Sequence, residues 1–340
     1  MLRRTTTALL LAGALGAIAL VSAGGPTAAQ DKKVVIGMPG IPPIFTTVQP
    51  LVAEKVGLFK KHGANVELRS FDNGTAAARA VIAGDIDMSM SPSPPVINQI
   101  SNSGANLVAI YGWPNADWVL ASIDPAKTSC KDMVGQGVGV DSVGGARSVA
   151  LRSLLAGGCP DVKIDQVQQV ALGSNASAAM LAGRLTFGVL HLDDLALIES
   201  QGRKLHVMLE MKKTNPDSHY LMLVVRGDKL KVNRDAYVRA VAAMVDAAGY
   251  MKDPNNADTV ADAAAPTGHP KDVNKAALKE FLAIDFWPSD SDGLDRTKLE
   301  ATIALMKKIG GIQPGKEVIA YDKLVDQSVW RDAVALLKKP

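Results

Sequence analysis

The sequence predicts an α/β protein with two similar lobes, and three observations carry this prediction. Strand-like and helix-like segments alternate through residues 34–190, and glycines punctuate them. The order of segments in the first part of this region recurs in the second part. Hydrophobic residues make up 47% of the chain and aromatic residues only 4%, which is typical of a globular α/β protein.

The first part of the chain has the order β-α-β-α-β. Thr75 stands where a helix N-cap belongs, directly after the turn residues Asp72, Asn73 and Gly74. The expected elements are a strand over 34–37, a helix over 48–62, a strand over 66–71, an Ala-rich helix over 75–83 and a strand over 85–91.

The second part repeats this order. Gly74-Thr75 and Gly173-Ser174 are 99 residues apart, and so are Ala83-Gly84 and Ala182-Gly183. Any βαβ unit can end in such glycines, but the equal offset favours one lobe in each half. The expected elements are a strand over 137–140, a helix over 146–156, a strand over 167–172, an Ala-rich helix over 174–182 and a strand over 184–190.

The remaining segments give the domain organisation. Strands over 118–123 and 220–225 would carry the chain into and out of the second lobe, and a helical region with several prolines follows. Helices are expected over 236–251, 257–265, 273–281, 298–309 and 329–337. We therefore predict a signal peptide over 1–29, a first lobe over 30–115 plus 226–340, and a second lobe over 116–225.

The N-terminus has the three parts of a secretory signal. Arg3 and Arg4 precede an apolar run over 8–23, and small residues follow up to Ala29. Cleavage after Ala29 or after Ala23 would release the protein into the periplasm, and an uncleaved membrane anchor is the alternative. No cysteine lies near these residues, so lipoprotein processing is not expected.

The net charge indicates which macromolecular partners are not expected, and the two cysteines indicate a disulfide. Lys and Arg number 37 and Asp and Glu number 34, for a net charge of +3, so neither nucleic acid nor anionic lipid is indicated as a partner. We expect a monomer. Cys130 and Cys159 are expected to form a disulfide in an exported protein, because a redox pair would have the CxxC spacing that this chain lacks.

The candidate ligand-binding residues follow the expected strands. In open parallel sheets, ligands bind outside the carboxyl ends of the strands, where helix starts also offer unpaired N–H groups to anions. The predicted site residues are Gly40, Ile41, Phe45, Asn73, Gly74, Thr75, Ser91 and Ser93 in lobe one, and Ser142, Gly144, Gly145, Ala146, Arg147, Ser174, Asn175, His191 and Asp193 in lobe two.

Each candidate also has a structural interpretation. Thr75 and Ser174 are N-cap candidates as well as ligand contacts. Arg147 either clamps a carboxylate or sulfonate or is solvated on a helix surface. His191 either donates to a ligand or caps a strand end. The glycine-rich loops could equally be tight turns with nothing bound.

Catalytic motifs are absent from the sequence. It contains no GxSxG, HExxH or GxxxxGK[ST] motif, and its five histidines are scattered. Asp193-Asp194 is an adjacent carboxylate pair, but neighbours on a strand point apart. Trp113 and Trp118 either stack on a flat ligand or pack near the hinge. We predict no enzyme activity, no cofactor and no metal.

Several segments resemble the nitrate/sulfonate/taurine-type periplasmic binding proteins of ABC importers. The similarity covers most of residues 33–250 and rests on VVIGMPG, LVAEKVGLFKKHGANVELRSF, NGTAAARAVIAGDIDMSMS, CKDMVGQGVGVDSVGGARSVALRSLL and SNASAAMLAGRLTFGVL. The resemblance implies a two-lobed type II periplasmic-binding-protein fold with the ligand between the lobes. It also implies contacts from 73–75 and 141–147, and a membrane permease as partner.

The ligand class is left open by the same resemblance. Relatives bind nitrate, sulfonates, aromatic acids, pyrimidine precursors of thiamin, and riboflavin, so a small anionic or aromatic organic molecule is expected here. The chain departs from the family pattern at Ser142 to Ala146, where relatives often have Gly-Ser-Thr, and at Thr186-Phe187, where they often have Asp-Ala. The alternatives are an enzyme like the pyrimidine-precursor synthases and a ligand-sensing partner of a membrane receptor.

Overall fold

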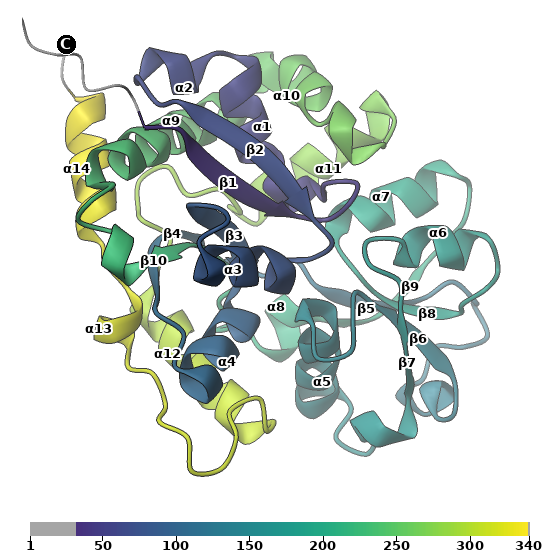
Figure 1. The fold of residues 1–340 in the computed structure, drawn as a ribbon. Coiled ribbons are helices and arrows are strands. Elements are labelled where there is room, and N and C mark those ends of the chain that lie inside the picture. Colours follow the sequence, from purple (N-terminus) through teal and green to yellow (C-terminus); the bar gives the residue numbers. More distant parts are fainter. Residues whose placement is uncertain (1–31, 339–340) are drawn as a thin grey trace, which may run out of the picture. The chain divides into compact units, whose positions relative to one another are not determined.

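The computed structural model describes residues 32–338, so the predicted signal peptide lies outside the described residues. A first five-stranded sheet has the order β2-β1-β3-β10-β4 (Figure 1). β1, β2 and β3 are parallel, and β10 runs antiparallel to both β3 and β4. The strands are β1 (Val34–Pro39), β2 (Val66–Phe71), β3 (Met88–Pro92), β4 (Leu107–Trp113) and β10 (Leu221–Arg226).

A second five-stranded sheet has the order β7-β6-β8-β5-β9. β6, β7 and β8 are parallel and β5 is antiparallel to β8 and β9, so the parallel trio of the first sheet recurs. The two-lobed α/β prediction is therefore confirmed in the strand pairing. The strands are β5 (Val119–Ser122), β6 (Gly137–Val140), β7 (Gln168–Ala171), β8 (Phe187–Leu190) and β9 (His206–Glu210).

Helices connect the strands of both sheets. The chain leaves the first sheet after β4 and returns to it at β10, so β10 belongs to the first sheet although it falls almost wholly within the predicted 116–225 lobe. The helices are α1 (Val48–Lys55), α2 (Leu58–Lys61), α3 (Gly74–Ala83), α4 (Ser93–Ser103), α5 (Ala146–Gly158), α6 (Ala176–Leu181), α7 (Leu192–Ser200), α8 (Met211–Thr214), α9 (Arg234–Lys252), α10 (Ala257–Ala263), α11 (Lys271–Ala283), α12 (Arg296–Lys308), α13 (Tyr321–Leu324) and α14 (Ser328–Leu337).

Short 3₁₀ turns complete the chain. They are Phe45–Thr47, Cys130–Met133, Ile164–Gln166, Gly227–Lys229, Pro254–Asn256 and Ala265–Thr267. Along residues 32–338 no helix combines the length and the hydropathy needed to cross a bilayer.

The predicted helix over 48–62 is wrong in one respect, because it is two helices. Gly57 lies between α1 and α2 with φ of 75°, a left-handed conformation that glycine adopts without steric cost. Apolar spacing continues across this break, which is why the sequence pattern alone reads as a single helix.

Two predicted helix N-caps are wrong by one or two residues. Asn73, and not Thr75, caps α3, since its Oδ1 accepts a hydrogen bond from the amide of Ala76 at 3.0 Å. The N-cap of α6 is Asn175 and not Ser174, and its side chain makes no capping hydrogen bond. Asn is as good an N-cap as Ser or Thr, so residue type alone could not fix the boundary.

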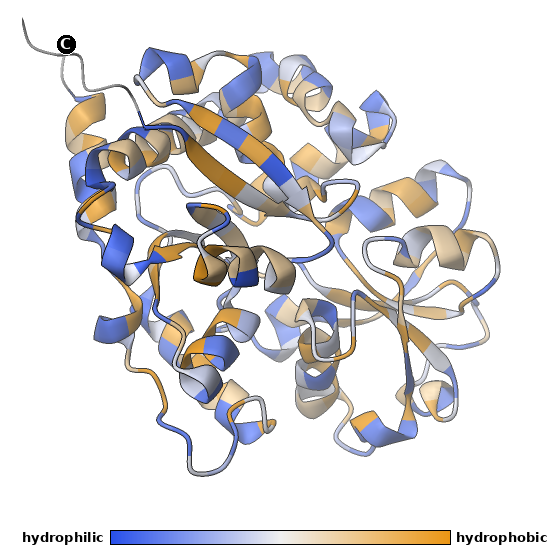
Figure 2. Ribbon diagram, in the orientation of Figure 1, coloured by the Kyte–Doolittle hydropathy of each residue, from blue (hydrophilic) through white to orange (hydrophobic). Residues whose placement is uncertain are grey.

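The interior of each sheet is apolar. Figure 2 shows hydrophobic residues concentrated in the strands, and β10 is buried along almost its whole length. Phe45 packs in an aromatic cluster with Phe281, Phe286 and Trp287, and its ring centroid lies 5.5 Å from that of Phe281. Phe45 is thus a core residue, which corrects its prediction as a ligand contact.

Cys130 and Cys159 form the expected disulfide. The bridge ties the 3₁₀ turn before β6 to the residue after α5, with the two Cα atoms 6.0 Å apart. It lies among core residues of the second sheet's layer, consistent with a structural role.

Candidate functional site

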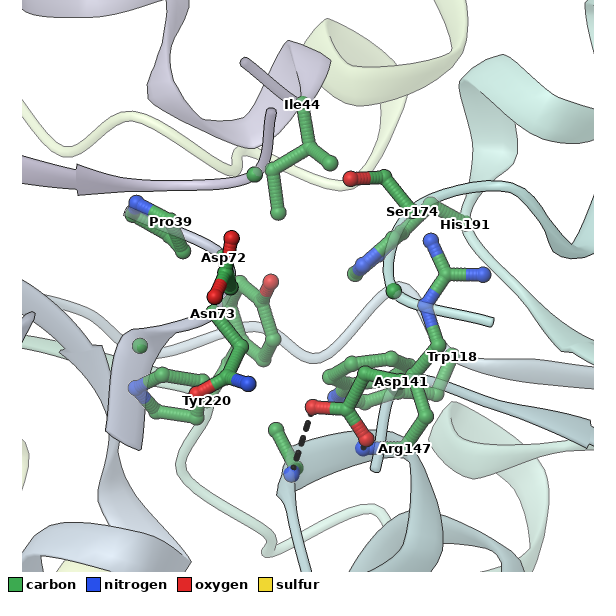
Figure 3. Close-up of a pocket in the computed structure, with 15 residues that line it drawn as sticks. Pro39, Ile44, Asp72, Asn73, Trp118, Asp141, Arg147, Ser174, His191 and Tyr220 are labelled. Carbon is green, nitrogen blue, oxygen red and sulfur yellow. Dashed lines mark hydrogen bonds between the residues drawn. The ribbon is translucent and has the colours of Figure 1, made fainter. Parts of the chain in front are cut away.

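A cavity lies at the carboxyl ends of the parallel strands of both sheets (Figure 3). Its empty volume is about 330 Å³, a figure that includes the part open to solvent. The lining residues are Pro39, Gly40, Ile44, Asp72, Asn73, Gly74, Pro92, Trp118, Asp141, Ala146, Arg147, Gly173, Ser174, His191 and Tyr220.

The structure brings seven of the predicted site residues together around this cavity. They are Gly40, Asn73, Gly74, Ala146, Arg147, Ser174 and His191. The other predicted residues do not line it. They are Ile41, Phe45, Thr75, Ser91, Ser93, Ser142, Gly144, Gly145, Asn175 and Asp193.

The first-sheet wall is built around the start of α3. Asn73 uses Oδ1 to cap the helix, so its Nδ2 group is left to face the cavity, and Asp72 lies exposed at the rim (Figure 3). Gly74 packs so closely on the end of β3 that a Cβ would lie 2.3 Å from Pro92 Cδ. Only glycine allows this approach, which positions Asn73 at the strand end.

Several predicted residues of the first wall serve the framework. Ser91 donates from Oγ to the carbonyl of Gly74 at 2.8 Å, and Ser93 Oγ lies 2.7 Å from His219 Nδ1. The Thr75 hydroxyl is buried without a hydrogen-bond partner among the described residues. Ile41 is 56% exposed on the surface. Ser91 and Ser93 therefore support the strand ends, and none of these four residues lines the cavity.

The second wall is built around the start of α5, and most of the backbone amides there already have partners within the protein. Asp141 Oδ2 accepts from the amide of Ala146 at 3.0 Å, and Oδ1 accepts from the amides of Ser142 and Arg147 at 2.8 and 3.1 Å. The amide of Gly144 donates to Ser148 Oγ, and that of Gly145 to the Ser142 carbonyl. The carboxylate of Asp141 therefore occupies the position expected for a bound anion.

Arg147 is 3% exposed, so it is not the solvated surface residue of one interpretation. Its Nη1 donates to the carbonyl of Val189 at 2.9 Å, and its Nη2 lies 3.2 Å from Asp194 Oδ2. The guanidinium also lies 6.0 Å from the ring centroid of Trp118. Much of its hydrogen-bonding capacity is thus used by the protein itself.

His191 is held by Asp117, a residue that no sequence pattern indicated. The carboxylate oxygens of Asp117 lie 2.8 and 3.0 Å from His191 Nδ1, and both side chains are almost fully buried. His191 Nε2 is buried and has no hydrogen-bond partner within residues 32–338. Figure 3 shows the edge of the imidazole pointing into the cavity. A buried nitrogen without a partner is costly unless a ligand or water satisfies it.

Aromatic rings form the floor beside His191. The ring centroid of Trp118 lies 4.2 Å from that of His191, and Tyr220 meets Trp118 edge-on at 5.4 Å. Burial raises the pKa of Tyr220 well above 10, so the phenol is neutral. Trp113, the other tryptophan considered from the sequence, donates to Gln49 Oε1 at 2.6 Å and does not line the cavity.

Asp193 lies behind this wall and not in it. Burial and the neighbouring Asp194 raise the pKa of Asp193 to about 6. Its Oδ2 is 3.8 Å from His269 Nδ1. Burial also acts to raise the pKa of Asp194, but Arg147 and His191 outweigh it and hold that pKa below its ordinary value.

A second cavity borders the first and is mainly apolar. It has a volume of about 400 Å³ and shares Pro92, Trp118, Ala146 and Tyr220 with the first. Its polar wall includes His219, whose pKa burial lowers to about 4. Within the described part of the chain, no group of three or more His, Cys, Asp and Glu side chains is placed to hold a metal.

The two sheets and these strand-end loops have the periplasmic-binding-protein fold, as the sequence motifs predicted. The model of the NMT1/THI5-like family matches residues 46–257, and the chain belongs to that family. A comparison with curated proteins finds no match.

Solved structures show the same fold at low sequence identity. A protein of Bordetella bronchiseptica RB50 superposes with a TM-score of 0.75 at 18% identity, over 90% of this chain and 98% of that one. The alkanesulfonate-binding protein SsuA of Xanthomonas axonopodis pv. citri, bound to MOPS, gives 0.69 at 15%, over 88% and 99%. The periplasmic nitrate-binding protein NrtA of Synechocystis PCC 6803 gives 0.70 at 14%, over 92% and 90%.

Proposed function

We propose that this protein is the periplasmic solute-binding component of an ABC importer, and that it captures a small organic molecule in the cavity between its two sheets. The observation that carries the proposal is the buried, unpartnered Nε2 of His191, which faces a cavity lined from both sheets. The sulfonate- and nitrate-binding neighbours support the same role.

Closure of the cavity is part of the proposal. Ser174 donates from Oγ to the carbonyl of Pro42 at 3.5 Å, so the loops of the two walls already meet at one point. Drawing the walls together around a ligand excludes water and strengthens each hydrogen bond made to it. The closed protein would then be the form that the membrane permease receives.

The direct test is native mass spectrometry of protein purified without added ligand, followed by a thermal-shift screen of small metabolites. A ligand at 100 times its Kd stabilises the folded protein by about 2.7 kcal/mol. His191→Ala should weaken binding about tenfold, because the ligand loses a buried hydrogen bond. His206→Ala, at an exposed histidine on β9, is the matched control and should bind normally.

Export is tested separately. Residues 1–40 fused to a reporter enzyme that works only outside the cytoplasm should give activity. A reporter that stays inactive, or a broad metabolite library in which nothing stabilises the protein, would count against the importer role.

The Asp117–His191 pair favours acid–base catalysis as a second candidate function. A histidine oriented by a buried carboxylate, with its other nitrogen unpartnered beside a cavity, has the geometry of a general base. Mass spectrometry of a bound ligand recovered after prolonged incubation separates the two functions, because a binding protein returns the ligand unchanged.

A further inference from the structure

We propose that the cavity selects a small organic cation, such as a protonated amine or amidine, rather than an anion. This inference rests on the proposed function and names the ligand class of the same site. It runs against the charge of the ligands named for the sulfonate- and nitrate-binding neighbours, so it separates this chain from them.

The first step is the loss of the anion site at the start of α5. An exposed helix start attracts anions because its first amides have no partners. Here Asp141 accepts from the amides of Ala146 and Arg147, and the amides of Gly144 and Gly145 donate to Ser148 Oγ and to the Ser142 carbonyl. A ligand anion would have to displace a covalently attached carboxylate.

The second step is the charge of the walls. Two carboxylates, those of Asp72 and Asp141, line the cavity, and they point into it from opposite walls (Figure 3). The guanidinium of Arg147 lines the same cavity, but Asp194 pairs with it at 3.2 Å. The unpaired charge that the cavity walls present to a ligand is therefore negative, and it favours the binding of a cation.

The third step is His191, which provides an observation independent of the acidic residues. A carboxylate only accepts hydrogen bonds, so Asp117 orients the ring with its proton on Nδ1. Nε2, the other ring nitrogen, is buried and has no hydrogen-bond partner among the described residues. A polar group of a ligand would satisfy this atom, which places a ligand contact beside the two cavity carboxylates.

The aromatic floor supports the same ligand class. Trp118 and Tyr220 line the cavity beside His191, and the faces of aromatic rings attract organic cations. The mainly apolar cavity that shares these two rings presents an apolar surface to the uncharged part of such a molecule.

The test uses three probes of nearly equal shape and different charge: benzamidine, benzamide and benzoate. The full chain is unfolded in urea, dialysed to remove any bound ligand and refolded, and titration calorimetry then measures each Kd. We expect benzamidine to bind most tightly and benzoate most weakly. Equal affinities, tighter binding of benzoate, or binding of none of the three overturns the cation inference.

A charge variant gives the second arm. Asp72→Asn removes one cavity charge at an exposed residue, so the fold should be unaffected, and benzamidine should bind roughly fivefold more weakly while benzamide is unchanged. Asp85→Asn, an equal charge change at an exposed residue beyond the other end of α3, should alter neither Kd. An equal loss for benzamidine and benzamide in Asp72→Asn contradicts the electrostatic argument.

The two proposals can fail separately. If the metabolite screen finds a ligand and that ligand is an anion, the importer role stands and the cation inference fails. If neither the screen nor the three probes bind, both proposals fail.

Discussion

His219 gives a prediction about folding stability that follows from its buried contacts. The ring donates from Nε2 to the carbonyl of Gly293 at 2.7 Å, and Nδ1 accepts from Ser93 Oγ at 2.7 Å. Both bonds suit the neutral imidazole. Burial lowers the pKa of His219 from 6.5 to about 4, which corresponds to about 3 kcal/mol of preference for the neutral form.

The sign of the pH effect follows from linkage. A histidine whose pKa is lower in the folded protein than in the unfolded chain binds a proton first in the unfolded chain. Its contribution to the free energy of unfolding is therefore complete above pH 6.5 and is lost as the pH falls to about 4. In His219→Gln this contribution is absent, so the stability difference between wild type and variant should shrink by about 3 kcal/mol between pH 7 and pH 4.

Urea denaturation at steps between pH 8 and pH 4 measures this difference directly. Other groups titrate in the same range, but they act equally on both proteins and cancel in the comparison. His206→Gln, at an exposed histidine, should give a curve parallel to wild type. Parallel curves for wild type and His219→Gln would refute the reasoning, since they would mean that burial does not suppress protonation of His219.

Two further predictions concern stability. Burial raises the pKa of Asp193, so the stabilising contribution of its protonated form to the free energy of unfolding is present below about pH 4 and is lost as the pH rises through about 6. Asp193→Asn should therefore raise the free energy of unfolding at pH 8 by up to about 3 kcal/mol and change it little at pH 4. Urea titrations at both pH values check this, and a variant less stable at pH 8 contradicts it. Replacing both Cys130 and Cys159 by Ala opens a bridge between residues 29 apart in sequence and should cost about 3–4 kcal/mol in the chain-entropy model. The same loss should appear in wild type under reducing conditions, and an unchanged denaturation midpoint would argue against it.

The repeated layout of strands and helices could be predicted because it depends on local patterns. Both sets of three parallel strands were predicted from alternating apolar residues, helices that end in glycine and an equal spacing of 99 residues. The strand-end rule then placed Asn73, Arg147 and His191 at one cavity before any contact was known. α4 was not predicted, since it contains two prolines and several polar residues, and β4 was not predicted either.

The contacts that decide the chemistry of the site could not be predicted in this way. Asp117 and His191 are 74 residues apart, and nothing in the sequence around either one indicates their pairing. Phe45 follows the first strand, as a ligand contact would, but it packs on Phe281 from the C-terminal helices. The capping role of Asp141 did have a local signal that could have identified it, because an acidic residue shortly before a helix favours the helix start.

The tight fit of Gly74 against Pro92 divides the binding wall into fixed and replaceable positions. A side chain at residue 74 would push the start of α3 away from β3 and move Asn73 with it, so this point cannot change without rebuilding the wall. Asp72 and Ser174 are not packed in this way and can be exchanged at little cost to folding. Redesign of the protein for a new ligand should therefore begin with these two side chains.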